Sequence, residues 1–119
     1  MLLARPTILL HPIGQQLQTL IECLLEFEGY RIVVGRRCRP TVQAFAGRPI
    51  DLLIMDPSEA GQMDVSSLQQ VVRSSPQMRI LCVSVSPTAP ALGSAQPIEF
   101  LRVPFGVSDL ITKVRDMVL

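Results

Sequence analysis

One carboxylate, Asp56, stands at the end of a short apolar run that spans residues 50–55. Five of these six residues are apolar, and a proline flanks the run on each side. A short apolar run with such boundaries is typical of a parallel strand that is buried on both faces. In open parallel sheets, ligands bind beyond the carboxyl ends of the strands. We therefore expect Asp56 at the rim of a sheet, where chemistry takes place.

Three further features could take part in chemistry, and each also has a plain structural interpretation. His11 could ligate a metal, but a lone histidine without a Cys, His or acidic neighbour in sequence rarely does so. Ser84 has no general base near it in sequence, which argues against serine catalysis. A short basic run, made of Arg36, Arg37 and Arg39, could hold a phosphate or an acidic partner, although such runs are usually solvated surface. Residues 11–14 do not form a dinucleotide fingerprint, so no enzyme class is indicated.

The composition indicates one small domain, 1–119, with ample material for a core. Apolar residues make up 48% and charged residues 18% of the 119, and the net charge is +1. A balance so close to neutral gives no field that would steer the chain toward nucleic acid or a membrane. Three cysteines without a C-x-x-C pair indicate free thiols in a reducing compartment. No apolar run is long enough for a signal peptide or a membrane span, so we expect a cytoplasmic protein.

Apolar periodicity divides the chain into alternating strands and helices. Strands are predicted at residues 7–11, 31–34, 50–55, 79–85 and 98–103. A first helix begins near residue 13 and is capped by Gly29, and the last helix begins near residue 107. Leu17, Leu20, Ile21, Leu24 and Leu25 form the core-facing side of the first helix, while Gln15, Gln18, Glu22 and Glu26 form its polar side.

The other connections are less regular. A short helix is expected after Pro40 and a third helix after Asp64, with a polar loop at residues 57–62 between the central strand and the third helix. Residues 86–97 contain three prolines among small residues, so a fourth helix would be shortened or irregular. Strands that alternate with helices form a parallel sheet through right-handed crossovers.

Several local signatures, in this order, resemble the receiver domain of bacterial response regulators over essentially the whole chain. They are the helix end at residues 28–30, the strand that ends in Asp56, the pair at residues 63–64, the strand at residues 80–84 and the strand and Pro-Phe turn at residues 100–105. The resemblance implies an α/β fold with a five-stranded, doubly wound parallel sheet of flavodoxin-like receiver topology, in the order 2-1-3-4-5. It also implies a site at the switch point between the first and third strands.

The resemblance places the family's phosphoacceptor at Asp56 and its switch residues at Ser84 and Phe100. Two family features, the acidic pair and the lysine, are missing, however. The acidic pair after the first strand would fall in residues 11–13, where His11 and Pro12 stand, and the family's lysine is replaced by Val103. Mg²⁺ needs oxygen ligands, usually one or two carboxylates, so metal binding is not expected. His11 would instead occupy the vacated acidic pocket.

These departures favour an atypical, pseudo-receiver module in bacterial signalling or transcriptional control that acts through protein contacts, without cofactor or enzymatic activity. In receivers, the fourth helix, fifth strand and fifth helix commonly form the output and dimer surface, so a protein partner or a second copy is expected there. An alternative is a phosphoacceptor that a histidine kinase phosphorylates at Asp56 in a two-component system. A third hypothesis is a phosphate or small-ligand sensor that uses the vacated pocket and the 36–39 loop.

Overall fold

The parallel sheet predicted from the sequence is present in the computed structural model. The structure describes residues 5–11, 13–34, 50–62, 69, 72–73, 75–85 and 97–118. Five strands hydrogen-bond in the order β2-β1-β3-β4-β5, and every neighbouring pair is parallel. The strands are β1 (Thr7–Leu10), β2 (Arg31–Val34), β3 (Leu52–Met55), β4 (Arg79–Ser84) and β5 (Ile98–Arg102). The fold class and the 2-1-3-4-5 strand order are therefore confirmed.

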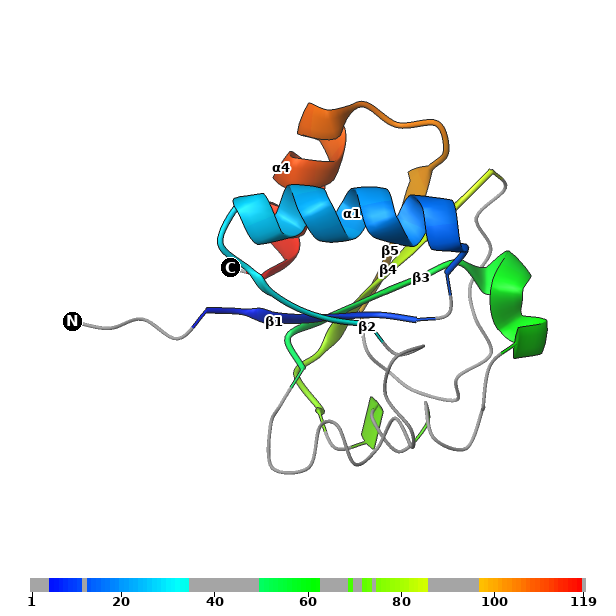
Figure 1. Cartoon of the computed structure of the whole chain (residues 1–119). Helices are drawn as coiled ribbons and strands as arrows, with labels where there is room; N and C mark the ends of the chain where they lie inside the picture. The colour runs from blue at the N-terminus through cyan, green and yellow to red at the C-terminus, as the bar shows by residue number, and fades with distance from the viewer. Residues whose placement is uncertain are drawn as a thin grey trace.

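Two long helices lie on the same face of this sheet (Figure 1). They are α1 (Gln15–Phe27) and α4 (Val107–Val118), and they contact each other. A short 3₁₀ helix, η2 (Pro57–Gln62), follows β3. The expected helices after Pro40 and Asp64 and the irregular segment at 86–96 lie largely or wholly outside the described residues.

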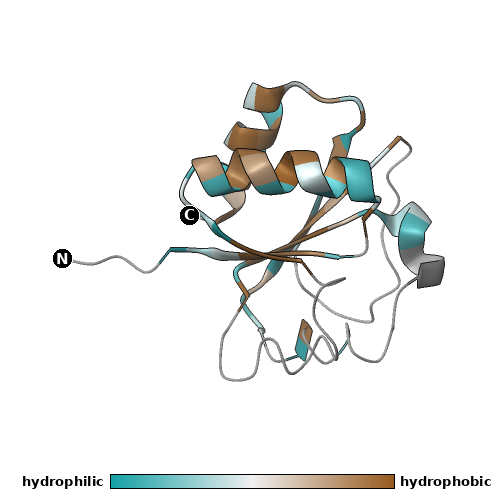
Figure 2. Cartoon of the chain, viewed as in Figure 1, coloured by the Kyte–Doolittle hydropathy of each residue, from teal (hydrophilic) through white to brown (hydrophobic). Residues whose placement is uncertain are grey.

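The core consists of two clusters, one on each face of the sheet. Alternate strand residues face α1 and α4, and the residues between them face the other side, as the period-2 geometry of strands requires. The helix side contains Ile8, Leu10, Leu52, Ile54, Leu81 and Val83 together with buried residues of α1 and α4. The other side contains Leu9, Leu53, Met55, Ile80 and Cys82. All four residues of β3 are buried, which explains its continuous apolar sequence. The strands at the centre of the sheet are correspondingly hydrophobic in Figure 2.

Helix α1 ends as predicted. Gly29 has a φ of 94°, which an L side chain rarely adopts. The Tyr30 amide donates to the Leu25 carbonyl at 3.1 Å, and the Gly29 amide donates to the Glu26 carbonyl at 3.0 Å. These two bonds form a Schellman cap, which satisfies carbonyls that the helix itself leaves free.

The assignment of core and polar sides in α1 was wrong at two positions. Gln18 is only 4% exposed, whereas Leu20 is 47% exposed. The buried side of the helix runs through Ile21 and Leu25, and Gln18 lies three and seven residues before them, on the same side. Leu20 lies at the edge of this side. The buried amide of Gln18 donates to the Glu22 carboxylate at 3.0 Å, so it is not left unsatisfied.

The prediction of a loop at residues 57–62 was also wrong, because these residues form the 3₁₀ helix η2. The carboxylate oxygen Oδ1 of Asp56 accepts a hydrogen bond from the Ser58 amide at 2.9 Å. The Glu59 amide donates to the Asp56 carbonyl at 3.0 Å. Asp56 therefore caps the first turn of η2, which sequence periodicity alone does not reveal.

Candidate functional site

The carboxyl ends of β1, β3, β4 and β5 lie along one edge of the sheet and bring together the residues predicted for the site. The His11 amide donates to the Ile54 carbonyl at 3.1 Å, which continues the pairing of β1 with β3 beyond Leu10. The Val103 amide donates to the Ser84 carbonyl at 2.8 Å, which continues the pairing of β4 with β5. These two bonds place His11 beside the end of β3 and Val103 beside Ser84. Pro12 lies outside the described residues.

Asp56 itself is half-buried and is engaged by its neighbours in sequence. Its Oδ1 accepts both the Ser58 amide at 2.9 Å and the Ser58 hydroxyl at 2.7 Å. This arrangement matches the structural interpretation of Asp56 as a carboxylate at a strand end that caps loop amides. A new group on Oδ1 would have to displace both hydrogen bonds.

The charge of Asp56 also acts on the buried thiol of Cys82. Met55 pairs with Cys82 in the sheet, so Asp56 follows directly after the residue that neighbours this cysteine. Burial, and secondly the negative charge of Asp56, raise the pKa of Cys82 to about 11. Cys82 is 0% exposed, so it is a core residue rather than a reactive thiol.

Residues on β5 point to alternate faces at this edge. Leu101 and Val103 pack against the cluster on the helix side, so Arg102 between them points away from that side. Arg102 is exposed. Phe100 is 43% exposed and pairs in register with Cys82. Ser84 is buried at 7% exposure at the end of β4.

One residue of this edge, Glu59, was missed in the sequence. A Cβ atom added at Gly14 would lie 3.6 Å from the Oε1 atom of Glu59. The carboxylate of η2 thus reaches the start of α1, next to residues 11–13 where no carboxylate stands in the sequence. In the sequence, only the position of Glu59 three residues after Asp56 could have indicated this approach to α1. The prediction of a loop at residues 57–62 did not include it.

Among the described residues, Asp56 and Glu59 are the carboxylates that this edge offers to a magnesium ion. Mg²⁺ requires near-octahedral oxygen ligation, usually with one or two carboxylates. One oxygen of Asp56 already accepts two hydrogen bonds. Among the residues that the structure describes, no three His, Cys, Asp or Glu side chains are close enough together to hold a metal ion.

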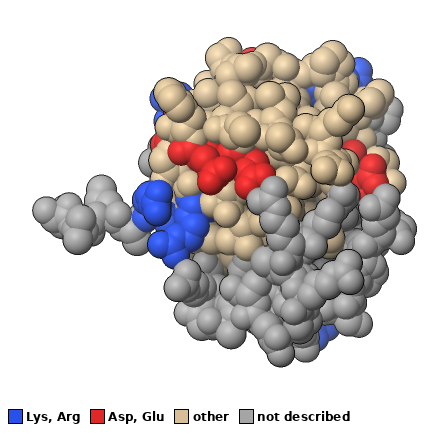
Figure 3. Space-filling model, in the orientation of Figure 1, with Lys and Arg blue, Asp and Glu red and all other residues tan. Residues whose placement is uncertain are grey.

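The basic side chains on the face drawn in Figure 3 do not form a broad positively charged surface. In this view the largest group of basic side chains lies next to an acidic patch, and other basic side chains are scattered near the edges of the view. Nucleic-acid binding usually needs a broader basic surface. The arginines at 36, 37 and 39 lie outside the described residues. No helix in the described part of the chain is long and apolar enough to cross a membrane.

The architecture matches solved receiver domains. A response regulator from Thermotoga maritima superimposes with a TM-score of 0.72 at 13% identity, covering 97% of this chain and 98% of that one. The chain has the receiver-domain fold. The receiver domain of a sensor histidine kinase from Pseudomonas aeruginosa, solved with magnesium in its active-site cleft, gives 0.70 at 20% identity, with 97% and 98% covered.

A third similar structure is the beryllofluoride-activated NtrC4 receiver domain, solved as a dimer, with a TM-score of 0.70 at 16% identity and 94% and 95% covered. No model of a sequence family and no curated protein matches the chain. At identities this low the likeness establishes the fold, and the chemistry has to be argued from the residues themselves.

Proposed function

We propose that this chain is a pseudo-receiver: a cytoplasmic signalling module with a receiver-domain fold that acts through protein contacts and is not switched by phosphorylation. The observation that carries the proposal is the state of Asp56. Its Oδ1 is held by the amide and hydroxyl of Ser58, and the lysine expected beside the Pro-Phe turn is replaced by Val103.

The electrostatics of a phosphorylated Asp56 support the same conclusion. Phosphoryl transfer depends on positioning and on neutralising the charge of the equatorial oxygens. A phosphoryl group on Asp56 would add up to about two negative charges. Among the described residues, neither a fitting magnesium site nor a lysine at position 103 is present to compensate them.

The surface formed by β5 and α4 is the contact surface that we propose for a protein partner or a second copy. Val107 at the start of α4 is 50% exposed, and Phe100, which is 43% exposed, lies on the opposite face of the edge strand β5. The Lys113 ammonium and the Glu99 carboxylate, 3.1 Å apart, link the helix to the strand beside them. Exposed apolar side chains with charged groups at their border are typical of protein interfaces.

The proposal is tested by intact-mass spectrometry after incubation with acetyl phosphate and Mg²⁺, in parallel with the Asp56→Asn variant. We expect no mass gain in either protein, while circular dichroism shows both to be folded. A gain of one phosphoryl group that is absent from Asp56→Asn would overturn the proposal.

That outcome would favour the second candidate, a phosphoacceptor that a histidine kinase phosphorylates at Asp56. The position of Asp56 favours it, because Asp56 is half-buried at the carboxyl end of β3 and close to the end of β4. A Ser58→Ala variant separates two causes of inertness. If the Ser58 hydroxyl blocks Asp56, this variant, which keeps the hydrogen bond from the amide of residue 58, gains the phosphoryl group. If the missing metal ligands and lysine are decisive, it stays unmodified.

A further inference from the structure

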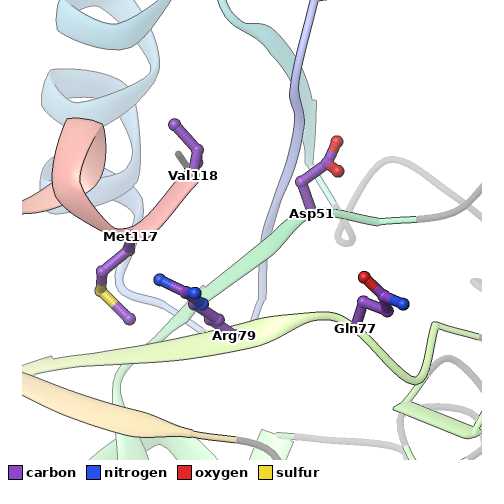
Figure 4. A pocket seen from close by; sticks show the side chains of 5 residues that line it. All are labelled: Asp51, Gln77, Arg79, Met117 and Val118. Carbon is purple, nitrogen blue, oxygen red and sulfur yellow. The ribbon is translucent and has the colours of Figure 1, made fainter.

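Away from the candidate site, the described residues form a cavity near the amino ends of β3 and β4 and an open sheet edge at β5. The cavity has a volume of about 190 Å³ and is lined by Asp51, Gln77, Arg79, Met117 and Val118. In Figure 4 the carboxylate of Asp51 points away from the guanidinium of Arg79. The cavity therefore presents no matched pair of charges to a ligand, whereas the edge at β5 presents a regular row of hydrogen-bonding groups.

The backbone groups of β5 alternate between two directions. β4 pairs with one side of β5, and no described strand pairs with its other side. The Ile80 amide donates to the Pro97 carbonyl at 2.9 Å, and the Val103 amide donates to the Ser84 carbonyl at 2.8 Å. In a parallel ladder every second residue directs its amide and carbonyl to the same neighbouring strand. The odd-numbered residues from 97 to 103 therefore use their backbone groups toward β4.

The even-numbered residues of β5, which are Ile98, Phe100 and Arg102, direct their amides and carbonyls outward. No hydrogen bond to a described residue uses any of these groups. Their side chains lie on the face of the sheet opposite α4, where Phe100 is 43% exposed. Pro104, at the next even position, has no amide hydrogen, so the row of donors ends at Arg102. An unpaired strand edge of this kind is a template for another strand.

We propose that β5 pairs with β5 of a second copy of this chain, antiparallel and around a twofold axis at Phe100, so that the two sheets join. This inference rests on the proposed contact surface of β5 and α4 and narrows it to the strand edge. The outward residues are symmetric about Phe100, as an interface between identical surfaces requires. Phe100 lies opposite Phe100 of the second copy, and Ile98 lies opposite Arg102 of the second copy. Each of these pairs exchanges two hydrogen bonds, so every outward amide and carbonyl of both strands is used.

The side chains at the joined edge fit the same register. On the face opposite α4 the two Phe100 rings meet at the axis, and aromatic pairs across neighbouring strands are favourable. Ile98 packs on the aliphatic stem of Arg102 of the second copy, and no like charges lie directly opposite each other. On the helix side, Glu99 of the second copy lies opposite Leu101. A hollow of about 340 Å³, lined by Leu101 and by residues of α4, leaves room for it there.

The edge strand at the other side of the sheet, β2, offers a shorter row. The Arg31 amide donates to the Pro6 carbonyl at 3.0 Å, so Arg31 directs its backbone groups toward β1. By the same alternation, Ile32 and Val34 are the residues of β2 that face outward. Val34 is only 5% exposed, whereas the outward residues of β5 include two that are exposed. The second copy therefore pairs at β5.

The first test is sedimentation equilibrium of the intact chain from roughly 10 µM to 1 mM, the range in which a small interface associates. We expect a reversible equilibrium between monomer and dimer. Phe100→Lys places two ammonium groups opposite each other at the axis and should weaken the dimer at least about tenfold. The matched control is Phe27→Lys, which makes the same change at an 89% exposed phenylalanine of α1 and should dimerise as the original chain does.

Hydrogen exchange of single amides, followed by NMR, identifies the strand edge itself. In the monomer the amides of Ile98, Phe100 and Arg102 should exchange fast, and those of Glu99 and Leu101 slowly, because only the latter are bonded to β4. In the dimer the three outward amides should exchange at least about tenfold more slowly. Contact through side chains alone does not produce this alternation.

Three results would overturn the proposal: a chain that stays monomeric at the highest concentration, equal dimerisation of Phe100→Lys and the original chain, or unchanged exchange of the Phe100 amide in the dimer. A monomeric chain would leave the edge to an extended segment of another protein. A Val107→Lys variant separates this proposal from the proposed contact surface. If Val107→Lys weakens the dimer and Phe100→Lys does not, the copies associate through α4, so the strand pairing is wrong while the contact surface stands. None of these results bears on the phosphorylation test at Asp56.

Discussion

A single buried hydroxyl holds the beginning of the central strand, and its removal should cost a measurable share of the stability. The Ile50 amide donates to the Ser75 hydroxyl at 2.9 Å, and this bond joins two segments that are 25 residues apart. Ile50 is 2% exposed and Ser75 is 3% exposed. In Ser75→Ala the Ile50 amide loses its acceptor in a place that water does not reach.

The expected cost follows from the penalty for an unsatisfied buried donor, which is about 1–3 kcal/mol. Unfolding entropy of about 2.1 cal/mol/K per residue gives this chain of 119 residues roughly 250 cal/mol/K. The melting temperature should therefore fall by about 4–12 °C. In urea, the midpoint should decrease while the slope m stays unchanged, because the surface exposed on unfolding is the same.

The control is Ser108→Ala, which removes an exposed hydroxyl on α4 and should change the unfolding free energy by less than about 0.5 kcal/mol. Hydrogen exchange of the Ile50 amide gives an independent measure, since its protection should drop in Ser75→Ala. If the two alanine variants are equally stable, the Ile50 amide has another acceptor and the reasoning is refuted.

Four further predictions concern the core thiol, the first helix and the proposed contact surface. Alkylation at neutral pH, read by peptide mass spectrometry, should modify exposed Cys23 much faster than Cys82. Because folding raises the pKa of Cys82 from 9.0 to about 11, its stabilisation is complete below pH 9 and should be lost as the pH rises to 11, which urea titrations at several pH values would detect. Gly29→Ala should lower the unfolding free energy by about 1 kcal/mol, because an alanine disfavours the positive φ of this residue, whereas its Cβ atom would meet no other atom within 4 Å. A neutral effect in denaturant titration would contradict this. Lys113→Ala should cost less than about 1 kcal/mol, since its pair with Glu99 is substantially exposed; a larger loss would show that the pair belongs to a network.

The sheet could be predicted from the sequence because its strands carry strong local signals. A continuously apolar run can be buried on both faces only near the centre of a covered sheet, and β3 is buried throughout. The end of α1 could be predicted equally well, because a glycine directly after an apolar helical repeat can adopt the positive φ that a C-terminal cap requires. The order of the strands was supplied by the resemblance to receiver domains and not by periodicity.

The remaining features depend on angles and contacts that residue types do not encode. Gln18 is polar, yet its position on the helix buries it, and the neighbouring Glu22 satisfies its amide. Glu59 reaches the start of α1 only because Asp56 caps a 3₁₀ turn in place of a loop. The cavity between Asp51 and Arg79 could not be predicted either, since it arises where the end of α4 comes down over the amino ends of two strands.

The fold of this chain and the chemistry of its candidate site are carried by different residues. The two core clusters are built from strand interiors and helix faces, and Asp56, His11 and Val103 stand at the ends of strands beyond their centres. Replacing a carboxylate or a lysine at such an edge removes little of the buried apolar area that stabilises the sheet. A receiver-domain fold is therefore weak evidence for phosphorylation, and the two hydrogen bonds from Ser58 to Asp56 are the more direct evidence on the fate of this carboxylate.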